Sequence, residues 1–201
     1  MRDRQFLGYN LVIKQIRGVS PVGEETQIIA KHALALSPKT ALDMGCGTGF
    51  IALYLAKHGI DCDAADINPF ALDLSRENAE TNNVQLTLYH SDLFENIPKK
   101  YDLITFNAPY GNASSAQWSR VLEWIKSFIP KKTFITKLSY YFIRGKRKEL
   151  TRRFLEQASH HVNENGKLIL LMDDYEMDVL LGKEHQILEP FFGGQVVLVT
   201  L

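Results

Sequence analysis

The stretch Asn107-Ala108-Pro109-Tyr110 places an amide, a rigid proline and an aromatic ring directly after a strand-like run, YDLITFN (101–107). Residues of these types also build ordinary turns, so the stretch alone leaves a turn and a functional site equally open. An asparagine side-chain oxygen and a backbone carbonyl can accept both hydrogens of a planar NH2 group. Tyr110 can stack on the flat face of such a group. This chemistry would suit a target amide or an aromatic amine.

A second candidate is the glycine-rich turn Gly45-Cys46-Gly47-Thr48-Gly49, which lies between the apolar run TALDM (40–44) and a helical pattern that starts at Phe50. Glycines let the backbone turn sharply and let a ligand lie against it, and the first N–H groups of a helix are unpaired. The spacing is G-x-G-x-G, whereas dinucleotide sites use G-x-G-x-x-G. Asp43 precedes the first glycine by two residues, so a ligand with a cationic amino group is favoured over a pyrophosphate.

Two more acids follow apolar runs. Asp66 ends the run IDCDAAD (60–66), about 20 residues after the first glycine, where a carboxylate can accept both hydroxyls of a ribose. Asp92 follows VQLTLYH (84–90) and is an acceptor beside Leu93 and Phe94, which could flank a base. Each feature alone is weak, because an acid after a strand is often a turn residue or a helix cap. Four such features after four runs are hard to assign to chance.

The elements that must position these residues alternate between strand and helix patterns. Further apolar runs at 167–172, 184–192 and 195–201 predict a strand and a terminal hairpin across Gly193-Gly194. Helices are predicted at 24–36, 50–58, 68–82 and 174–182, and another one ends near Val162. This order predicts an α/β fold with a mostly parallel sheet covered on both faces. In such a sheet, ligands bind outside the carboxyl ends of the strands.

Length and composition fit one globular domain, residues 1–201, with an amino-terminal arm and helix at 1–37 and a variable insert at 111–144. The formal net charge is zero and 45% of the residues are hydrophobic. Cys46 and Cys62 do not suggest disulfides or a metal site, so a reducing, cytoplasmic location is expected. The sequence has neither a signal-peptide pattern nor an apolar window that approaches the roughly 18 residues of a membrane span.

The segments LDMGCGTG, DINPFALDLSRENAETN, SDLF and YDLITFNAPY resemble the class I methyltransferases that bind S-adenosylmethionine (SAM). The likeness is to the HemK-like branch and its relatives that methylate amino groups of bases, and it covers about residues 19–172. It implies a Rossmann-like fold with seven strands in the order 3-2-1-4-5-7-6, the last strand being antiparallel. It also implies SAM as cofactor and S-adenosylhomocysteine as product.

The resemblance further implies roles for individual residues. Asp43 and the turn from Gly45 through Cys46 and Gly47 to Gly49 would hold the methionine part of SAM. Asp66 would bind the ribose, Asp92 would accept from the adenine amino group, and Leu93 would lie against the ring. Asn107 would face the methyl group, together with the backbone carbonyl of Ala108. The remaining implied site residues are Thr26 and Ile67 on the cofactor side, and Pro109 and Tyr110 on the target side.

The sequence departs from the usual Asn-Pro-Pro-Tyr motif at Ala108. Alanine keeps the backbone carbonyl but loses some stiffness, because proline fixes φ. Three functions therefore stay open: methylation of a protein glutamine, methylation of an amino group of adenine or guanine in RNA or less favourably DNA, and SAM binding without transfer.

Residues 111–160 carry eleven lysines and arginines, among them Lys146, Arg147 and Lys148, against three glutamates, a net charge of +8. This segment is either a solvated surface or an electrostatic footprint for RNA or a ribosome-linked protein. The expected partner is a macromolecule tied to translation, either a glutamine-bearing protein or RNA, and an activating subunit remains open. Only about 40 residues precede the first predicted strand, so the long amino-terminal domain of bacterial HemK-like proteins is not expected here.

Overall fold

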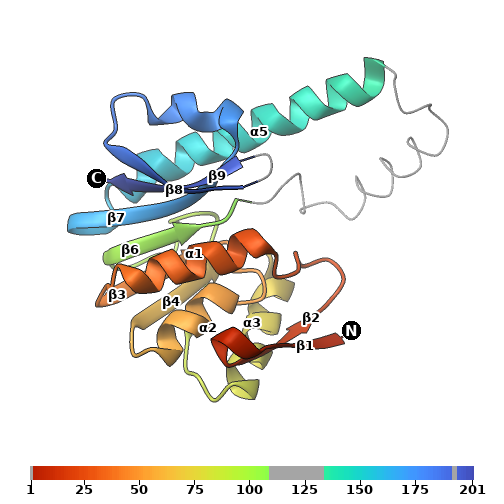
Figure 1. Ribbon diagram of the computed structural model, residues 1–201, viewed down its shortest axis with the longest axis vertical. Helices are drawn as coiled ribbons and strands as arrows, with labels where there is room; N and C mark the ends of the chain where they lie inside the picture. Colours follow the sequence, from red (N-terminus) through yellow and green to blue (C-terminus); the bar gives the residue numbers. More distant parts are fainter. Residues whose placement is uncertain (1, 109–133, 192–193) are drawn as a thin grey trace.

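The computed structural model describes residues 2–108, 134–191 and 194–201 (Figure 1). Within these ranges, seven strands form one sheet: β3 (Thr40–Met44), β4 (Asp61–Asp66), β5 (Thr87–His90), β6 (Tyr101–Phe106), β7 (Val162–Met172), β8 (His185–Phe191) and β9 (Gly194–Thr200). Their order is β5-β4-β3-β6-β7-β9-β8, and β9 runs antiparallel to both of its neighbours. The predicted α/β class, strand order and antiparallel edge are confirmed.

Helices cover both faces of this sheet (Figure 1). The helices α1 (Glu24–Ala35), α2 (Phe50–Lys57) and α3 (Pro69–Thr81) lie on one face, and α5 (Phe134–Ala158) lies on the other. Strand β7 shows why the centre of the sheet reads as a continuous apolar run. Ile169 and Leu171 pack on the α1 side, whereas Leu168 and Leu170 pack on the α5 side.

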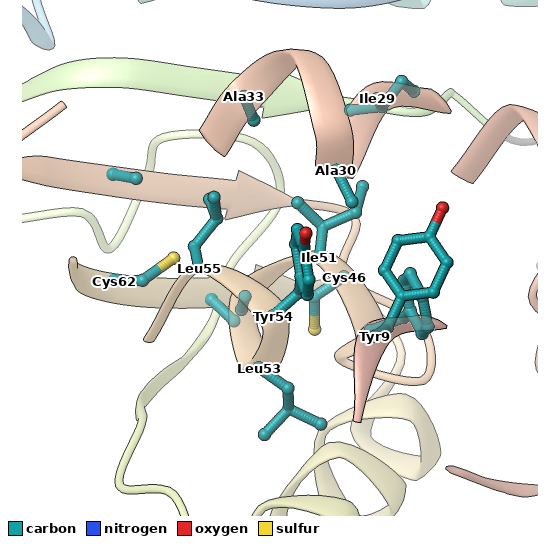
Figure 2. Packing of buried hydrophobic residues seen from close by; sticks show 14 of the residues in the cluster. Tyr9, Ile29, Ala30, Ala33, Cys46, Ile51, Leu53, Tyr54, Leu55 and Cys62 are labelled. Carbon is teal, nitrogen blue, oxygen red and sulfur yellow. The ribbon is translucent and has the colours of Figure 1, made fainter. Parts of the chain in front are cut away.

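An amino-terminal arm precedes this core, and the sequence analysis did not foresee its strands. Strand β1 (Arg2–Phe6), the 3-10 turn η1 (Leu7–Tyr9) and strand β2 (Leu11–Gln15) form an antiparallel hairpin beside α2 and α3. Figure 2 shows Tyr9 of the arm beside Tyr54 of α2. Their rings pack edge to face, with the ring centroids 4.9 Å apart. The arm is therefore packed into the hydrophobic core.

Several boundaries differ from the sequence prediction. The helix expected to end near Val162 ends at Ala158, and Val162 is the first residue of β7. Helix α5 begins at Phe134, inside the range expected as a variable insert, and the predicted 174–182 helix is the 3-10 helix η2 (Asp174–Leu180). In the expected hairpin turn, Gly193 lies outside the described residues and Gly194 starts β9.

Among the helices of the described ranges, none combines the length and apolarity needed to span a bilayer.

Candidate functional site

The carboxyl ends of β3, β4 and β5 meet at one edge of the sheet and are tied together by backbone hydrogen bonds. The N–H groups of Gly45 and Cys46 both donate to the carbonyl of Ala65, at 2.8 and 3.0 Å. The N–H of Ser91 donates to the carbonyl of Asp66 at 3.1 Å. The glycine turn and the segment after β5 therefore border the end of β4 from both sides, as the sequence predicted.

Asp43 is a buried carboxyl group on β3, directly before this turn. Thr105 of β6 donates its hydroxyl to Oδ1 at 2.8 Å, whereas Oδ2 has no hydrogen-bond partner among the described residues. Burial raises the pKa of Asp43 to about 7, although the Thr105 hydroxyl and the N–H of Ala52 favour the ionised form. A cationic group at Oδ2 would favour the ionised form of this carboxyl group.

The glycine turn adopts the backbone conformation for which its glycines are needed. Gly45, Gly47 and Gly49 all have positive φ, at 69°, 54° and 78°, where other residues are strained. A Cβ atom on Gly49 would also lie 3.0 Å from Oγ of Ser75 in α3. The thiol of Cys46 is buried 3.4 Å from the same Oγ, and burial raises its pKa well above the ordinary value, which fits a packing role.

Asp66 shapes the turn as well as standing at the end of β4. Its Oδ2 accepts from the N–H of Gly47 at 2.9 Å, and its Oδ1 accepts from the N–H of Asn68 at 2.8 Å. Burial raises its pKa, and these two N–H groups oppose the shift. Each carboxylate oxygen can accept one more hydrogen bond, so both ribose hydroxyls could still be bound.

An apolar and acidic rim surrounds this end of the sheet. The side chain of Ile67 is 57% exposed beside Asp66, and Leu93 is buried in a left-handed backbone conformation, with φ 50°. Asp92 is partly exposed, and Arg153 of α5 places a guanidinium nitrogen 3.5 Å from both of its carboxylate oxygens. Arg153 was not predicted as a residue of this site, because it lies 61 residues away from Asp92 in the chain.

Asn107 and Ala108 follow β6 at the same edge. Nδ2 of Asn107 donates to Oγ1 of Thr26 in α1 at 3.2 Å, which joins two residues that the sequence assigned to the site separately. This bond leaves Oδ1 of Asn107 as the acceptor of the side chain. Ala108 is buried against the α5 side of the core. Pro109 and Tyr110, the other two residues of the expected motif, lie outside the described residues.

The basic helix α5 carries fewer available charges than its sequence suggests. Arg147 is buried, and its guanidinium group donates to Asp173 at 3.2 Å and to the carbonyl of Leu171 at 2.9 Å. Its Nε also forms an ion pair with Glu176 at 3.2 Å. Lys148 bonds Asp178. Arg152 bonds Glu149 within the same helix. The expectation that Arg147 belongs to a basic surface is wrong, because acids that follow β7 in the sequence enclose it.

Comparison with known proteins identifies the family of this chain. The family model for the methyltransferase small domain matches residues 20–127, which include the glycine turn, Asp66, Asp92 and Asn107. The chain belongs to the methyltransferase small domain family. It is 33% identical over 150 residues to a putative protein N5-glutamine methyltransferase of Methanocaldococcus jannaschii, an alignment that covers 74% of this chain and 68% of that protein.

Other relatives are similar over shorter ranges or in fold. A release factor glutamine methyltransferase of Streptococcus pneumoniae is 52% identical over 73 residues, which is 35% of this chain and 26% of that protein. The solved structure of the 16S rRNA N2 G1207 methyltransferase of T. thermophilus, in complex with AdoMet and guanosine, superimposes with a TM-score of 0.70 at 17% identity. That superposition covers 99% of this chain and 49% of the other one, and it shows a shared fold.

Family membership makes this chain a SAM-dependent methyltransferase, as the sequence resemblance implied. The residues present fit that cofactor. The buried Oδ2 of Asp43 lacks the cationic partner that an amino group would provide, and Asp66 keeps acceptor capacity for a ribose. Two residues that support this site were not predicted from the sequence. Thr105 donates a hydrogen bond to Asp43, and Ser75 donates one to the carbonyl of Gly47 in the glycine turn. The sequence feature that could have indicated both is a hydroxyl side chain among buried apolar neighbours, on β6 for Thr105 and on α3 for Ser75.

Proposed function

We propose that this chain transfers a methyl group from SAM to a planar NH2 group, and that the target is the side-chain amide of a glutamine in a translation-related protein. The observation that carries the proposal is the bond from Asn107 Nδ2 to Thr26 Oγ1 at the end of β6. With Nδ2 donating to Thr26, Oδ1 is the atom of this side chain that accepts an N–H of the target.

The residues act by binding and orienting the target nitrogen. Oδ1 of Asn107 and the carbonyl of Ala108 would each accept one hydrogen of the NH2 group. These bonds would draw the nitrogen out of conjugation with its own carbonyl and aim its lone pair at the methyl carbon. These acceptors also stabilise the positive charge that grows on nitrogen during the reaction. SAM, when bound, supplies the electrophilic methyl group. Holding the two reactants in line can contribute about 7 kcal/mol or more to the rate enhancement.

The proposed cofactor residues surround the ends of β3, β4 and β5. Asp43 would bind the amino group of SAM, Asp66 the ribose hydroxyls and Asp92 the adenine amino group. Ile67 and Leu93 would provide apolar surface for the adenine, and Thr26 would hold Asn107 in place. The other proposed cofactor contacts come from the glycine turn, Gly45, Cys46, Gly47 and Gly49, and the other target contacts come from Pro109 and Tyr110.

A protein glutamine is favoured over RNA for two reasons. The two curated relatives described above are named as glutamine methyltransferases, although this chain spans only 26% of the release factor enzyme. In addition, the side chains of Arg147, Lys148 and Arg152 are bonded to carboxylates, so these cations are less available to phosphates. The net charge of +8 on residues 111–160 supports RNA as the second candidate.

Transfer of radiolabelled methyl from SAM tests both candidates in one assay. The purified chain is incubated with a bacterial release factor and, separately, with ribosomal RNA, and each product is digested with protease or nuclease. We expect label in the protein that protease removes and nuclease does not. A release factor in which the target glutamine is replaced by asparagine is the matched control. Label in RNA would select the second candidate, and SAM binding without any label would indicate a protein that binds SAM without transferring its methyl group.

A further inference from the structure

Helix α3 holds the glycine turn through two carbonyl groups. Oγ of Ser75 donates to the carbonyl of Gly47 at 3.1 Å, and Nδ2 of Asn78 donates to the carbonyl of Thr48 at 2.9 Å. Both side chains are completely buried. Since a trans peptide group is planar, fixing the Thr48 carbonyl also fixes the N–H of Gly49 on the opposite edge of the same plane. Asn78 therefore sets the orientation of a peptide group in the turn.

The same carboxamide also holds the amino-terminal arm. Oδ1 of Asn78 accepts from the N–H of Lys14 at 2.8 Å, and Nδ2 donates to the carbonyl of Lys14 at 3.2 Å. The side chain thus pairs with β2 as a neighbouring strand would. Beyond β2 the chain passes the turn again, because a Cβ atom on Gly47 would lie 3.7 Å from Cγ1 of Val19. The arm and the turn therefore meet at one buried side chain.

Asn82, one helical turn later, provides a natural comparison. Its Oδ1 accepts from the N–H of Val12 at 2.9 Å and its Nδ2 donates to the carbonyl of Val12 at 2.7 Å, so it holds the arm in the same manner. Its remaining bond goes to the carbonyl of Asn78 within α3, at 2.7 Å, and not to the glycine turn. The two asparagines differ mainly in that one of them also contacts the turn.

We propose that Asn78 is a positioning residue for SAM binding, which couples the amino-terminal arm to the glycine turn. The inference rests on SAM being the ligand of that turn. When the turn is occupied, its carbonyls are held more firmly in place, so Asn78 is held and β2 is retained more strongly. Coupling of this kind is reciprocal, so release of the arm from Asn78 weakens the turn as a binding site.

Calorimetric SAM titration of the wild type, Asn78→Ala and Asn82→Ala tests the proposal. Both variants lose the same kind of bonds to the arm, so both should lower the midpoint of thermal unfolding. Only Asn78→Ala should weaken SAM binding, by about tenfold, whereas Asn82→Ala should stay within about twofold of the wild type. Equal effects of the two variants on SAM binding would overturn the proposal. If the wild type did not bind SAM, the proposed function itself would be refuted, independently of the role of Asn78.

Hydrogen exchange in the wild type decides the matter even where Asn78→Ala does not fold. The N–H groups of Val12 and Lys14 are followed by NMR with and without saturating S-adenosylhomocysteine. We expect the product to slow exchange at both N–H groups. Exchange rates that do not change on binding would contradict a coupling between the arm and the cofactor site, while leaving methyl transfer itself intact.

Discussion

Replacing Asp43 by asparagine should change the pH dependence of stability in a defined direction. Burial raises the pKa of this carboxyl group from 3.8 to about 7. The shift of about 3 pKa units corresponds to about 4 kcal/mol of unfolding free energy. Because the folded-state pKa is raised, the stabilisation is complete below about pH 4 and is lost as pH rises through about 7. Asparagine has the same shape and does not ionise.

The assay is urea unfolding of the wild type and Asp43→Asn at a series of pH values from about 4 to about 8. Asparagine leaves a buried NH2 group in place of Oδ2, which costs about 1–3 kcal/mol at every pH. The free energy of unfolding of the variant minus that of the wild type should therefore increase by about 4 kcal/mol across this range. SAM affinity of the wild type should fall as pH drops below about 7, since a neutral carboxyl group binds an ammonium group poorly.

Asp102→Asn is the matched control with the opposite sign. The hydrogen bond from Asn163 lowers the pKa of Asp102, and burial opposes this shift. Its stabilisation is present above the unfolded-state pKa and is lost only as pH falls through the lowered folded-state value. The Asp102 variant should therefore show a constant difference around neutral pH. A difference for Asp43→Asn that is equally constant between about pH 4 and about pH 8 would refute the reasoning about Asp43.

Four further substitutions test cofactor binding, the backbone carbonyl of the motif and the ion pairs of α5. Asp66→Ala should weaken SAM binding by more than about tenfold in calorimetry, because it removes the proposed ribose acceptor and leaves the N–H of Gly47 without its partner. Unchanged SAM affinity would show that Asp66 does not bind the cofactor. Ala108→Pro should keep methyl transfer, since the backbone carbonyl is retained. Because the residue is buried, the larger side chain should lower the free energy of unfolding in urea by about 1–3 kcal/mol. Loss of transfer in a folded variant would argue against a role for the carbonyl. Arg147→Met should lower the free energy of unfolding by about 3–5 kcal/mol, because it leaves Asp173 and Glu176 as buried carboxylates without their cation. Lys148→Met should lower it by at most about 1 kcal/mol, because its ion pair is partly exposed. Equal effects of the two variants would contradict this account.

Local patterns predicted the parts of the fold whose signals lie close together in the chain. The strand at 40–44 has its predicted bounds, and the helix that starts after Asn68 is capped by that residue, as the Asn-Pro pair indicated. The positions of Asp43, Asp66 and Asn107 at one sheet edge followed from the rule that parallel strands end together. The sheet order came from the family resemblance.

Features that depend on distant partners could not be predicted from sequence. The arm strand β2 is held by Asn78 and Asn82, more than 60 residues away, and its own residues give only a short apolar signal. Arg147 looks like one more basic residue until Asp173 and Glu176 are brought beside it. The predicted helix ran on to Val162 because its apolar spacing fits a helix, whereas in the structure Val162 pairs with Tyr101 of β6.

The central claim is that Asn107 binds the NH2 group that receives the methyl group. Mass spectrometry of a release factor incubated with SAM and either the wild type or Asn107→Ala tests it directly, with SAM affinity measured in parallel. We predict one methyl group on a glutamine with the wild type and a loss of most of this product with the variant, while SAM affinity stays within a few-fold. Undiminished glutamine methylation by Asn107→Ala would contradict the account.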